Sequence, residues 1–271
     1  MYDTINFSIN NNGTIKTLET SKKNYNIEIK ENVIEIEVSL CKYFHGQNAD
    51  TLKFKEVEIA VKKLCANLDI DNAKVNRIDF STVLTVENAP TYYYKYFGEL
   101  AGYNRVIYKN SLYYNSDNET VLFYDKTKEL EAKGVKKPKK YKGKNLLRYE
   151  IRYFNTEGIF IKDLYNKDFF NSLVYLWRKK YKTINKVINT TDKDLKKAQR
   201  HGLEKCLTSS RKATYELKKL KRPAKDRNKR VRSIDYIYKD IFNNQTYKDI
   251  KEIDTKIQTV FIRYVRELKK R

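Results

Sequence analysis

Short stretches of alternating apolar and polar residues dominate the first half of the chain and predict β-strands. They occur in TINFSI, NYNIEI, VIEIEVSL, VNRIDFSTVLTV, RVIYKN, SLYYN, ETVLFYD and LLRYEIRYF, and the three before the last predict a meander. Apolar residues change to helical spacing between Asp50 and Leu68, where Asp50 or Thr51 is expected to cap a helix. Two further helices are expected, one that begins at Pro90 and one over KTKELEAKG that ends at Gly134.

Helical spacing continues from about Ile161 to the end of the chain, with apolar residues three or four positions apart and basic residues between them. The pattern therefore predicts an α+β fold. We expect a mostly antiparallel sheet with packed helices in the N-terminal part, followed by a basic helical region. The expected domains are an α+β body over residues 1–160 and a basic helical region over residues 161–271. The charge and the motifs described below make the first the candidate catalytic domain and the second the candidate DNA-binding or accessory region.

Charge is distributed unevenly between the two halves of the chain. The 271 residues include 57 Lys and Arg against 34 Asp and Glu, a net charge of +23. Residues 1–133 have a net charge of −2, so the excess lies after residue 133. This asymmetry indicates a polyanion-binding region attached to a near-neutral body. The loop VKKPKKYKGKN is the most basic turn of the first 160 residues, and its DNA-binding candidates are Lys136, Lys137, Lys139 and Lys140.

Several classes of protein are excluded by what the sequence lacks. Three isolated cysteines cannot form a disulfide framework or a zinc site, and we interpret them as small core residues. Only two histidines occur, which excludes a paired-histidine metal site, and no Gly-Lys-Ser/Thr motif for a nucleotide phosphate is found. His45 is expected on the surface or in a turn. No membrane span and no signal peptide is visible, so we expect a cytoplasmic protein without a membrane partner.

Two strands place acidic and basic residues on one face, which is unusual for a sheet. The alternation predicts one polar face on each strand, comprising Arg77, Asp79 and Ser81 on the first and Arg148, Glu150 and Arg152 on the second. Buried charges without partners are costly, so two interpretations remain open. Asp79 and Glu150 either pair with the neighbouring arginines or form a divalent-metal site that faces phosphate.

Six motifs, in order along the chain, resemble the phage and plasmid replication initiators of the gene II/X type and, more distantly, the Rep proteins of rolling-circle plasmids. The motifs are MYDTINF, SLCKYFHGQN, NRIDFS, SLYYN, VLFYDKTKEL and LLRYEIRYF. The resemblance extends over roughly residues 1–185. It implies a site-specific DNA nickase that starts rolling-circle replication through a covalent 5′-phosphotyrosyl intermediate and leaves a 3′-OH primer.

The resemblance also implies roles for individual residues. The family nucleophile lies in an apolar–apolar–Tyr–x–Lys pattern, which falls here on Tyr124 and Lys126. The metal positions fall on Asp79 and Glu150, which would hold Mg²⁺ or Mn²⁺, while Val83 and Leu84 stand where some plasmid relatives have an acid. Arg148 and Arg152 join the loop lysines as DNA-binding candidates. Tyr181 lies on a basic helical face, and it is either the alternative nucleophile or a helix-packing residue.

The implied partners are origin DNA, as a single strand or a supercoiled duplex, a host helicase and polymerase, and a second copy of the chain in a homodimer. The implied location is the cytoplasm of a bacterial host. A non-catalytic protein of a phage or plasmid that binds single-stranded nucleic acid is the alternative, because interleaved Tyr and Lys residues suit base stacking equally well. A structural protein that packages nucleic acid is a third interpretation.

Overall fold

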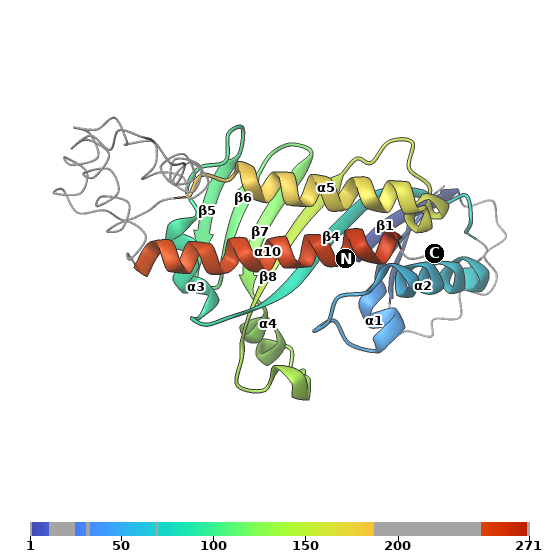
Figure 1. The fold of residues 1–271 in the computed structure, drawn as a ribbon. Coiled ribbons are helices and arrows are strands. Elements are labelled where there is room, and N and C mark those ends of the chain that lie inside the picture. The colour runs from blue at the N-terminus through green and yellow to red at the C-terminus, as the bar shows by residue number, and fades with distance from the viewer. Residues whose placement is uncertain (1, 11–24, 31–32, 69, 187–244, 270–271) are drawn as a thin grey trace, which may run out of the picture.

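A computed structural model describes residues 2–10, 25–30, 33–68, 70–186 and 245–269, and shows one eight-stranded antiparallel sheet (Figure 1). The strand order is β2-β3-β1-β4-β8-β7-β6-β5, so β4 and β8 lie in the centre. The strands are β1 (Tyr2–Asn10), β2 (Tyr25–Lys30), β3 (Val33–Ser39), β4 (Lys74–Val86), β5 (Asn104–Tyr108), β6 (Ser111–Asn115), β7 (Glu119–Asp125) and β8 (Asn145–Phe154). This arrangement confirms the predicted α+β class and the meander β5-β6-β7.

Six α-helices and three short 3₁₀ turns are described beside the sheet. The α-helices are α1 (Leu40–His45), α2 (Phe54–Leu68), α3 (Pro90–Tyr93), α4 (Lys126–Ala132), α5 (Lys167–Thr183) and α10 (Gln245–Lys269). The 3₁₀ turns are η1 (Tyr94–Tyr96), η2 (Lys139–Tyr141) and η3 (Ile161–Tyr165). The basic segments predicted to be helical between residues 187 and 244 lie outside the described residues.

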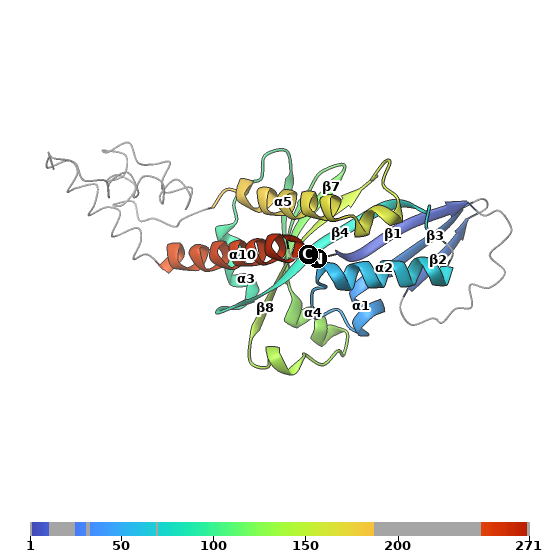
Figure 2. The same ribbon diagram turned by 45° about the vertical axis from the view of Figure 1, so that its right-hand side comes forward.

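The two faces of the sheet differ in chemistry. One face is apolar and is covered by α2, α5 and α10, which lie in front of the sheet in Figure 1 and again in the turned view of Figure 2. Alternation along each strand directs residues such as Ile5, Phe80 and Ile151 into this layer, where they are fully buried. The other face is polar, and α1 and α4 lie at the lower end of the sheet in Figure 1.

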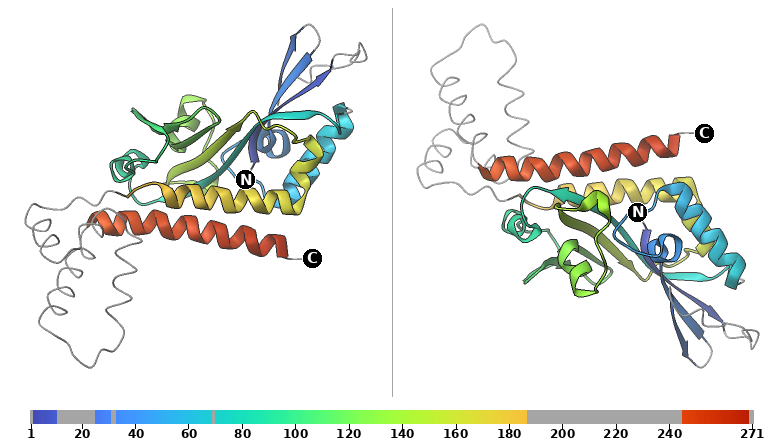
Figure 3. Two further views of the ribbon diagram at one scale, coloured as in Figure 1. Left: turned by 90° about the horizontal axis from the view of Figure 1, so that it is seen from above. Right: turned by 90° about the horizontal axis from the view of Figure 1, so that it is seen from below.

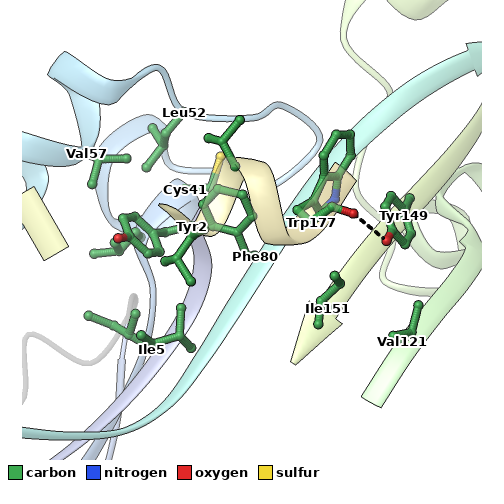
Figure 4. Packing of buried hydrophobic residues seen from close by; sticks show 14 of the residues in the cluster. Tyr2, Ile5, Cys41, Leu52, Val57, Phe80, Val121, Tyr149, Ile151 and Trp177 are labelled. Atoms are coloured by element: carbon green, nitrogen blue, oxygen red, sulfur yellow. Dashed lines mark hydrogen bonds between the residues drawn. The ribbon is translucent and has the colours of Figure 1, made fainter. Parts of the chain in front are cut away.

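Aromatic residues form the centre of the core between the sheet and α5. Tyr149 of β8 stacks on Phe123 of β7 with ring centroids 4.7 Å apart, and Trp177 of α5 lies 5.0 Å from Tyr149 (Figure 4). The Tyr149 hydroxyl donates a hydrogen bond of 3.0 Å to the carbonyl oxygen of Trp177. This contact satisfies a buried hydroxyl and fixes α5 to the middle of the sheet.

Helices from the basic part of the chain complete this core. Tyr181 of α5, and Ile253 and Tyr264 of α10, are buried in the same cluster as the strand residues. The N-terminal part therefore buries its sheet with helices from beyond residue 160. The proposed functional division at that residue stays a prediction.

Local details of the sequence prediction have mixed outcomes. Gly134 has a φ of 63° directly after the end of α4, as expected for a glycine that ends a helix. Asp50 and Thr51, the expected N-caps of the helix that ends at Leu68, were wrong, because α2 begins at Phe54. There the Glu56 carboxylate accepts a hydrogen bond from the backbone N–H of Lys53. Asp50 instead pairs with Lys140, 2.6 Å away.

Two expectations about isolated side chains are met in the described part of the chain. Cys41 and Cys65 are buried and free, and His45 is exposed at the end of α1. Cys206 and His201 lie outside the described residues. Within the described ranges, no helix has the length and apolar composition needed to cross a membrane.

Truncation of Trp177 tests whether its contact with Tyr149 organises the core. Because Trp177 is fully buried, Trp177→Ala should lower the free energy of unfolding by about 3–5 kcal/mol, measured by urea denaturation. Its neighbour Leu176 is 46% exposed, so Leu176→Ala should cost less than about 1 kcal/mol. Equal losses in the two variants would contradict this account of the core.

Candidate functional site

A polar cavity of about 290 Å³ opens on the face of the sheet that the helical layer leaves uncovered. Strands β1, β3, β4, β7 and β8 contribute most of its floor, and α4 contributes one wall. The predicted residues that line it are Asp79, Tyr124, Glu150 and Arg152. The cavity therefore brings together residues that lie up to 73 positions apart in the sequence.

The register of the three central strands explains this convergence. Residues directly opposite one another in antiparallel strands direct their side chains to the same face. Three successive rows across β4, β8 and β7 are Asp79–Arg152–Thr120, Ser81–Glu150–Leu122 and Val83–Arg148–Tyr124. The predicted polar faces of β4 and β8 thus form one continuous surface.

Asp79 is enclosed by arginines at one end of this surface. Its two carboxylate oxygens accept from Nε and Nη2 of Arg77, at 2.7 and 2.6 Å. Burial raises the pKa of Asp79 to about 7, the Arg77 hydrogen bonds oppose this shift, and the negative charge of Glu150 adds to it. The two carboxylates therefore lie close enough to repel each other.

Glu150 lies between two further arginines. Its Oε2 accepts from Nε of Arg148 at 3.0 Å, and its Oε1 accepts from Nε of Arg152 at 2.8 Å. The Nε of Arg152 also lies 3.8 Å from Oδ2 of Asp79, so one guanidinium is shared by both carboxylates. Asp79 and Glu150 therefore form the ion pairs with neighbouring arginines that one of the two interpretations expected.

The two carboxylates also have features that suit a divalent metal. They supply hard oxygen ligands side by side, and the shared position of Arg152 shows that a cation is stabilised between them. The side chains of Arg77 and Arg152 are 25% and 29% exposed, so both border solvent at this point. In the described part of the chain no group of three or more His, Cys, Asp or Glu residues has metal-binding geometry. A metal here would therefore have two carboxylate ligands from the protein.

Arg148 is the buried centre of the site. It is 1% exposed, donates to Ser81 Oγ at 2.6 Å, and pairs with Asp3 of β1 as well as with Glu150. These partners leave it no surface for a DNA phosphate in this conformation. A DNA contact through Arg148, as the sequence predicted, would require the site to open.

Asp3 is a member of the site that the sequence analysis missed. Ile5 and Phe7 are buried on the apolar face, so strict alternation along the strand would place Asp3 on that face too. The pairing of β1 with β4 is irregular between Tyr2 and Ile5, however, and both Asp3 and Thr4 line the cavity. The Oδ1 atom of Asp3 is buried without a hydrogen-bond partner among the described residues. A strand bulge of this kind leaves no recognisable pattern in the sequence.

Tyr124 lies half-buried beside these charges and lines the cavity. The guanidinium of Arg148 is 5.8 Å from the centroid of its ring, and Nζ of Lys126 is 6.0 Å away. Burial raises the pKa of Tyr124 well above its usual value, and the charge of Arg148 opposes this effect. The charge of Arg148 therefore favours a phenolate at Tyr124, whereas the carboxylates of Glu150, Asp3 and Glu129 oppose it.

Lys126 reaches the site from the first residue of α4. Strand β7 ends at Asp125, whose carboxylate caps α4 by accepting from the backbone N–H of Lys128 at 3.0 Å. Lys126 is fully buried, and its Nζ lies 2.7 Å from Oε2 of Glu129. Burial lowers the pKa of Lys126 to about 8, the charge of Arg148 adds to this shift, and Glu129 opposes both.

The remaining predicted residues lie away from the cavity. Tyr181 is 3% exposed on the opposite face of the sheet, and its hydroxyl donates to Asp254 at 2.6 Å, which is the geometry of a packing residue. In the lysine loop, Lys136 and Lys139 are exposed, Lys137 donates to the carbonyl of Lys144, and Lys140 pairs with Asp50. The loop follows α4 along the chain, but none of these four lysines lines the cavity.

Comparison with known proteins supports the resemblance found in the sequence. A model of the phage CRI family, described as the N-terminal region of a replication-associated protein, matches residues 1–164. All residues of the cavity fall within that range. No curated protein sequence matches the chain. The family match therefore covers the whole of the site and confirms the resemblance.

The lowered pKa of Lys126 predicts a stability difference at alkaline pH. Below about pH 8 both folded and unfolded chains hold the proton, and the folded state retains the cost of a buried charge. Between about pH 8 and pH 10.5 the folded state releases the proton first. As the pH increases through this range, the free energy of unfolding of the wild-type protein should therefore rise relative to that of Lys126→Met, by up to about 3 kcal/mol.

Urea titrations of both proteins across this pH range measure the difference, in which other titrating groups cancel. Lys128→Met is the matched control, because Lys128 lies in the same helix and is 58% exposed. A difference between wild type and Lys126→Met that stays constant with pH would contradict the burial of this ammonium group.

Proposed function

The chain belongs to the phage CRI family of replication-associated proteins, and we propose from this premise that it initiates replication by nicking one DNA strand at an origin. The reaction is a transesterification by Tyr124. The observation that supports it most is that a half-buried tyrosine lines the same polar cavity as Asp79 and Glu150, with the guanidinium of Arg148 5.8 Å from the centroid of its ring.

The bond changes follow from the chemistry of tyrosine. The phenolate oxygen of Tyr124 attacks the scissile phosphorus, a bond from phosphorus to Tyr124 forms, and the bond from phosphorus to O3′ breaks. The O3′ leaving group takes up a proton and becomes the 3′-OH primer. The 5′-phosphotyrosyl linkage conserves the energy of the phosphodiester bond for later rejoining of the strand.

Positive charge around Tyr124 is the main contribution of the protein to this step. Because burial and the neighbouring carboxylates favour the neutral phenol, the charge of Arg148 is needed to stabilise the phenolate. Lys126, whose Nζ is 6.0 Å from the ring centroid, is the second cation that would act on the reacting oxygen. The same charges act on the negative charge that develops at phosphorus. The pairing of Lys126 with Glu129 holds the ammonium group in place while it remains buried.

A divalent ion, Mg²⁺ or Mn²⁺, is part of this proposal. Asp79 and Glu150 would hold it, and it would supply positive charge that polarises the scissile phosphate. The partly exposed arginines Arg77 and Arg152 would then be free to contact phosphates of the bound strand. Lysines of the loop after α4 would extend this contact along the DNA backbone.

Replacement of Tyr124 tests the nucleophile directly. Tyr124→Phe removes one oxygen and little packing, so folding and DNA binding should persist. Nicking of supercoiled origin DNA with Mg²⁺, and the covalent protein–DNA adduct on denaturing gels, should both disappear. Peptide mapping of the wild-type adduct should place the nucleotide on Tyr124.

Tyr181→Phe is the matched control and should retain the adduct, because Tyr181 lies in the core on the other face of the sheet. An adduct that persists in Tyr124→Phe would show that the assignment is wrong. If wild-type protein binds the DNA but never nicks it, the non-catalytic alternative holds.

Neutralisation of the two carboxylates tests the metal. Mn²⁺ should raise the Tm of the wild-type protein, because a ligand that binds only the folded state stabilises it. Asp79→Asn and Glu150→Gln should abolish both this shift and nicking, while DNA affinity in EDTA remains.

Glu37→Gln is the control, since Glu37 also lines the cavity but is 41% exposed and pairs only distantly with Arg77, at 3.5 Å. A metal-induced Tm shift that survives in both Asp79→Asn and Glu150→Gln would show that these carboxylates do not bind the metal and serve only as ion-pair partners of the arginines.

A further inference from the structure

One stripe along α10 is basic and faces solvent. The exposed cationic side chains of α10, among those that the structure describes, are Lys248, Lys251, Arg263, Arg266 and Lys269. No acidic side chain in the described part of α10 is exposed. The spacing of three or four residues, continued through exposed Thr255 and Thr259, places the stripe on one side of the helix.

Three of the four acidic residues of α10 are turned toward the body of the protein. Asp249 accepts from the hydroxyls of Tyr92 and Tyr96, at 2.8 and 3.2 Å. Glu252 accepts from Tyr93 at 2.5 Å, and Asp254 accepts from Tyr181 at 2.6 Å. Tyrosine hydroxyls thus hold three carboxylates against the core and leave the positive charge of the helix outside.

We propose that the stripe of Lys248, Lys251, Arg263, Arg266 and Lys269 binds the phosphate backbone of duplex DNA. The carboxylates nearest to this row, Glu252 and Glu267, are only half-buried, but the five cations are exposed and outnumber them. A row of this kind is complementary to the regular negative charge of a duplex. Aromatic side chains for base stacking are absent from the described exposed residues of α10, whose Phe261 and Tyr264 are buried. The stripe therefore suits phosphates and not unstacked bases.

The dimensions of the helix agree with this partner. A helix of 25 residues is about 37 Å long at about 1.5 Å per residue. One turn of B-form DNA extends about 34 Å. Helix α10 is also held rigidly, because Arg178 of α5 donates to Gln258 at 2.9 and 2.6 Å and lies 4.2 Å from the ring centroid of Phe261.

The position of the stripe separates it from the cleavage site. Helices α5 and α10 cover the apolar face of the sheet, as the views from above and below in Figure 3 show, whereas the cavity with Tyr124 opens on the polar face. A DNA segment on the stripe is therefore not the segment that is cut. The protein can hold duplex DNA on one face while a single strand enters the cavity on the other.

The inference goes beyond the proposed nicking reaction and is tested without cleavage. Binding of a labelled duplex and of a single strand of equal length is measured by fluorescence anisotropy in EDTA over a series of salt concentrations. The variant Lys248→Gln/Lys251→Gln/Arg266→Gln should flatten the dependence of log K on log salt for the duplex, by up to about 0.9 for each phosphate that is no longer neutralised. The slope for the single strand should change less.

The matched control removes the same number of charges from α2 and the residue before it. Lys53→Gln/Lys55→Gln/Lys63→Gln also replaces exposed lysines on the helical face of the molecule and should leave the duplex slope unchanged. A second variant adds charge, so loss of folding cannot explain its effect. Thr255→Lys/Thr259→Lys extends the stripe through its middle and should steepen the duplex slope.

Three results would overturn the proposal. The first is a duplex slope that is unchanged in both α10 variants. The second is an equal flattening in the α2 control, which would indicate only an effect of net charge. The third is an equal flattening for single-stranded and duplex DNA, which would show that the stripe does not select the duplex. None of these results depends on whether Tyr124 is the nucleophile.

Discussion

The buried guanidinium of Arg148 joins the elements that form the polar face of the sheet. It pairs with Asp3 of β1 and Glu150 of β8, donates to Ser81 of β4, and lies beside the ring of Tyr124 in β7. Loss of one partner from a buried ion pair leaves an uncompensated charge, which destabilises a protein by several kcal/mol. Arg148 therefore links side chains from four strands, and loss of any one of its charged partners would leave a buried charge uncompensated.

This constraint also explains why the outer arginines are suited to exchange partners. Arg152 pairs with Glu150, as Arg148 does, and Arg77 pairs with Asp79, but about a quarter of each outer side chain is exposed to solvent. A phosphate or a metal ion can therefore displace Arg77 and Arg152 at a lower cost than it could displace Arg148. The site combines a buried arginine at its centre with partly exposed arginines at its rim, which suits the proposed binding of a charged strand.

The helical layer has a second polar anchoring system. Tyrosine hydroxyls of α3 and η1, more than 150 residues earlier in the chain, bind carboxylates of α10, and so does the hydroxyl of Tyr181 in α5. These contacts orient α10 about its axis, so that its apolar side packs on the sheet and its cations face outward. Tyr92, Tyr93 and Tyr96, which the sequence alone would offer for base stacking, instead donate hydrogen bonds to carboxylates inside the protein.

The sequence by itself determined the strands, the helices α4 and α5, and the faces of β4 and β8, because alternation with period two assigns each side chain to one side of a strand. It also indicated Asp79, Tyr124, Glu150 and Lys126 through the family resemblance. Only the tertiary structure decided that β4, β8 and β7 are neighbours in a register that aligns these residues. Tertiary structure alone also brought Asp3 into the site, since a bulge reversed the direction that alternation assigns to it. Pairing between distant strands and local irregularities depend on packing across the whole sheet, and no local pattern of residues specifies them.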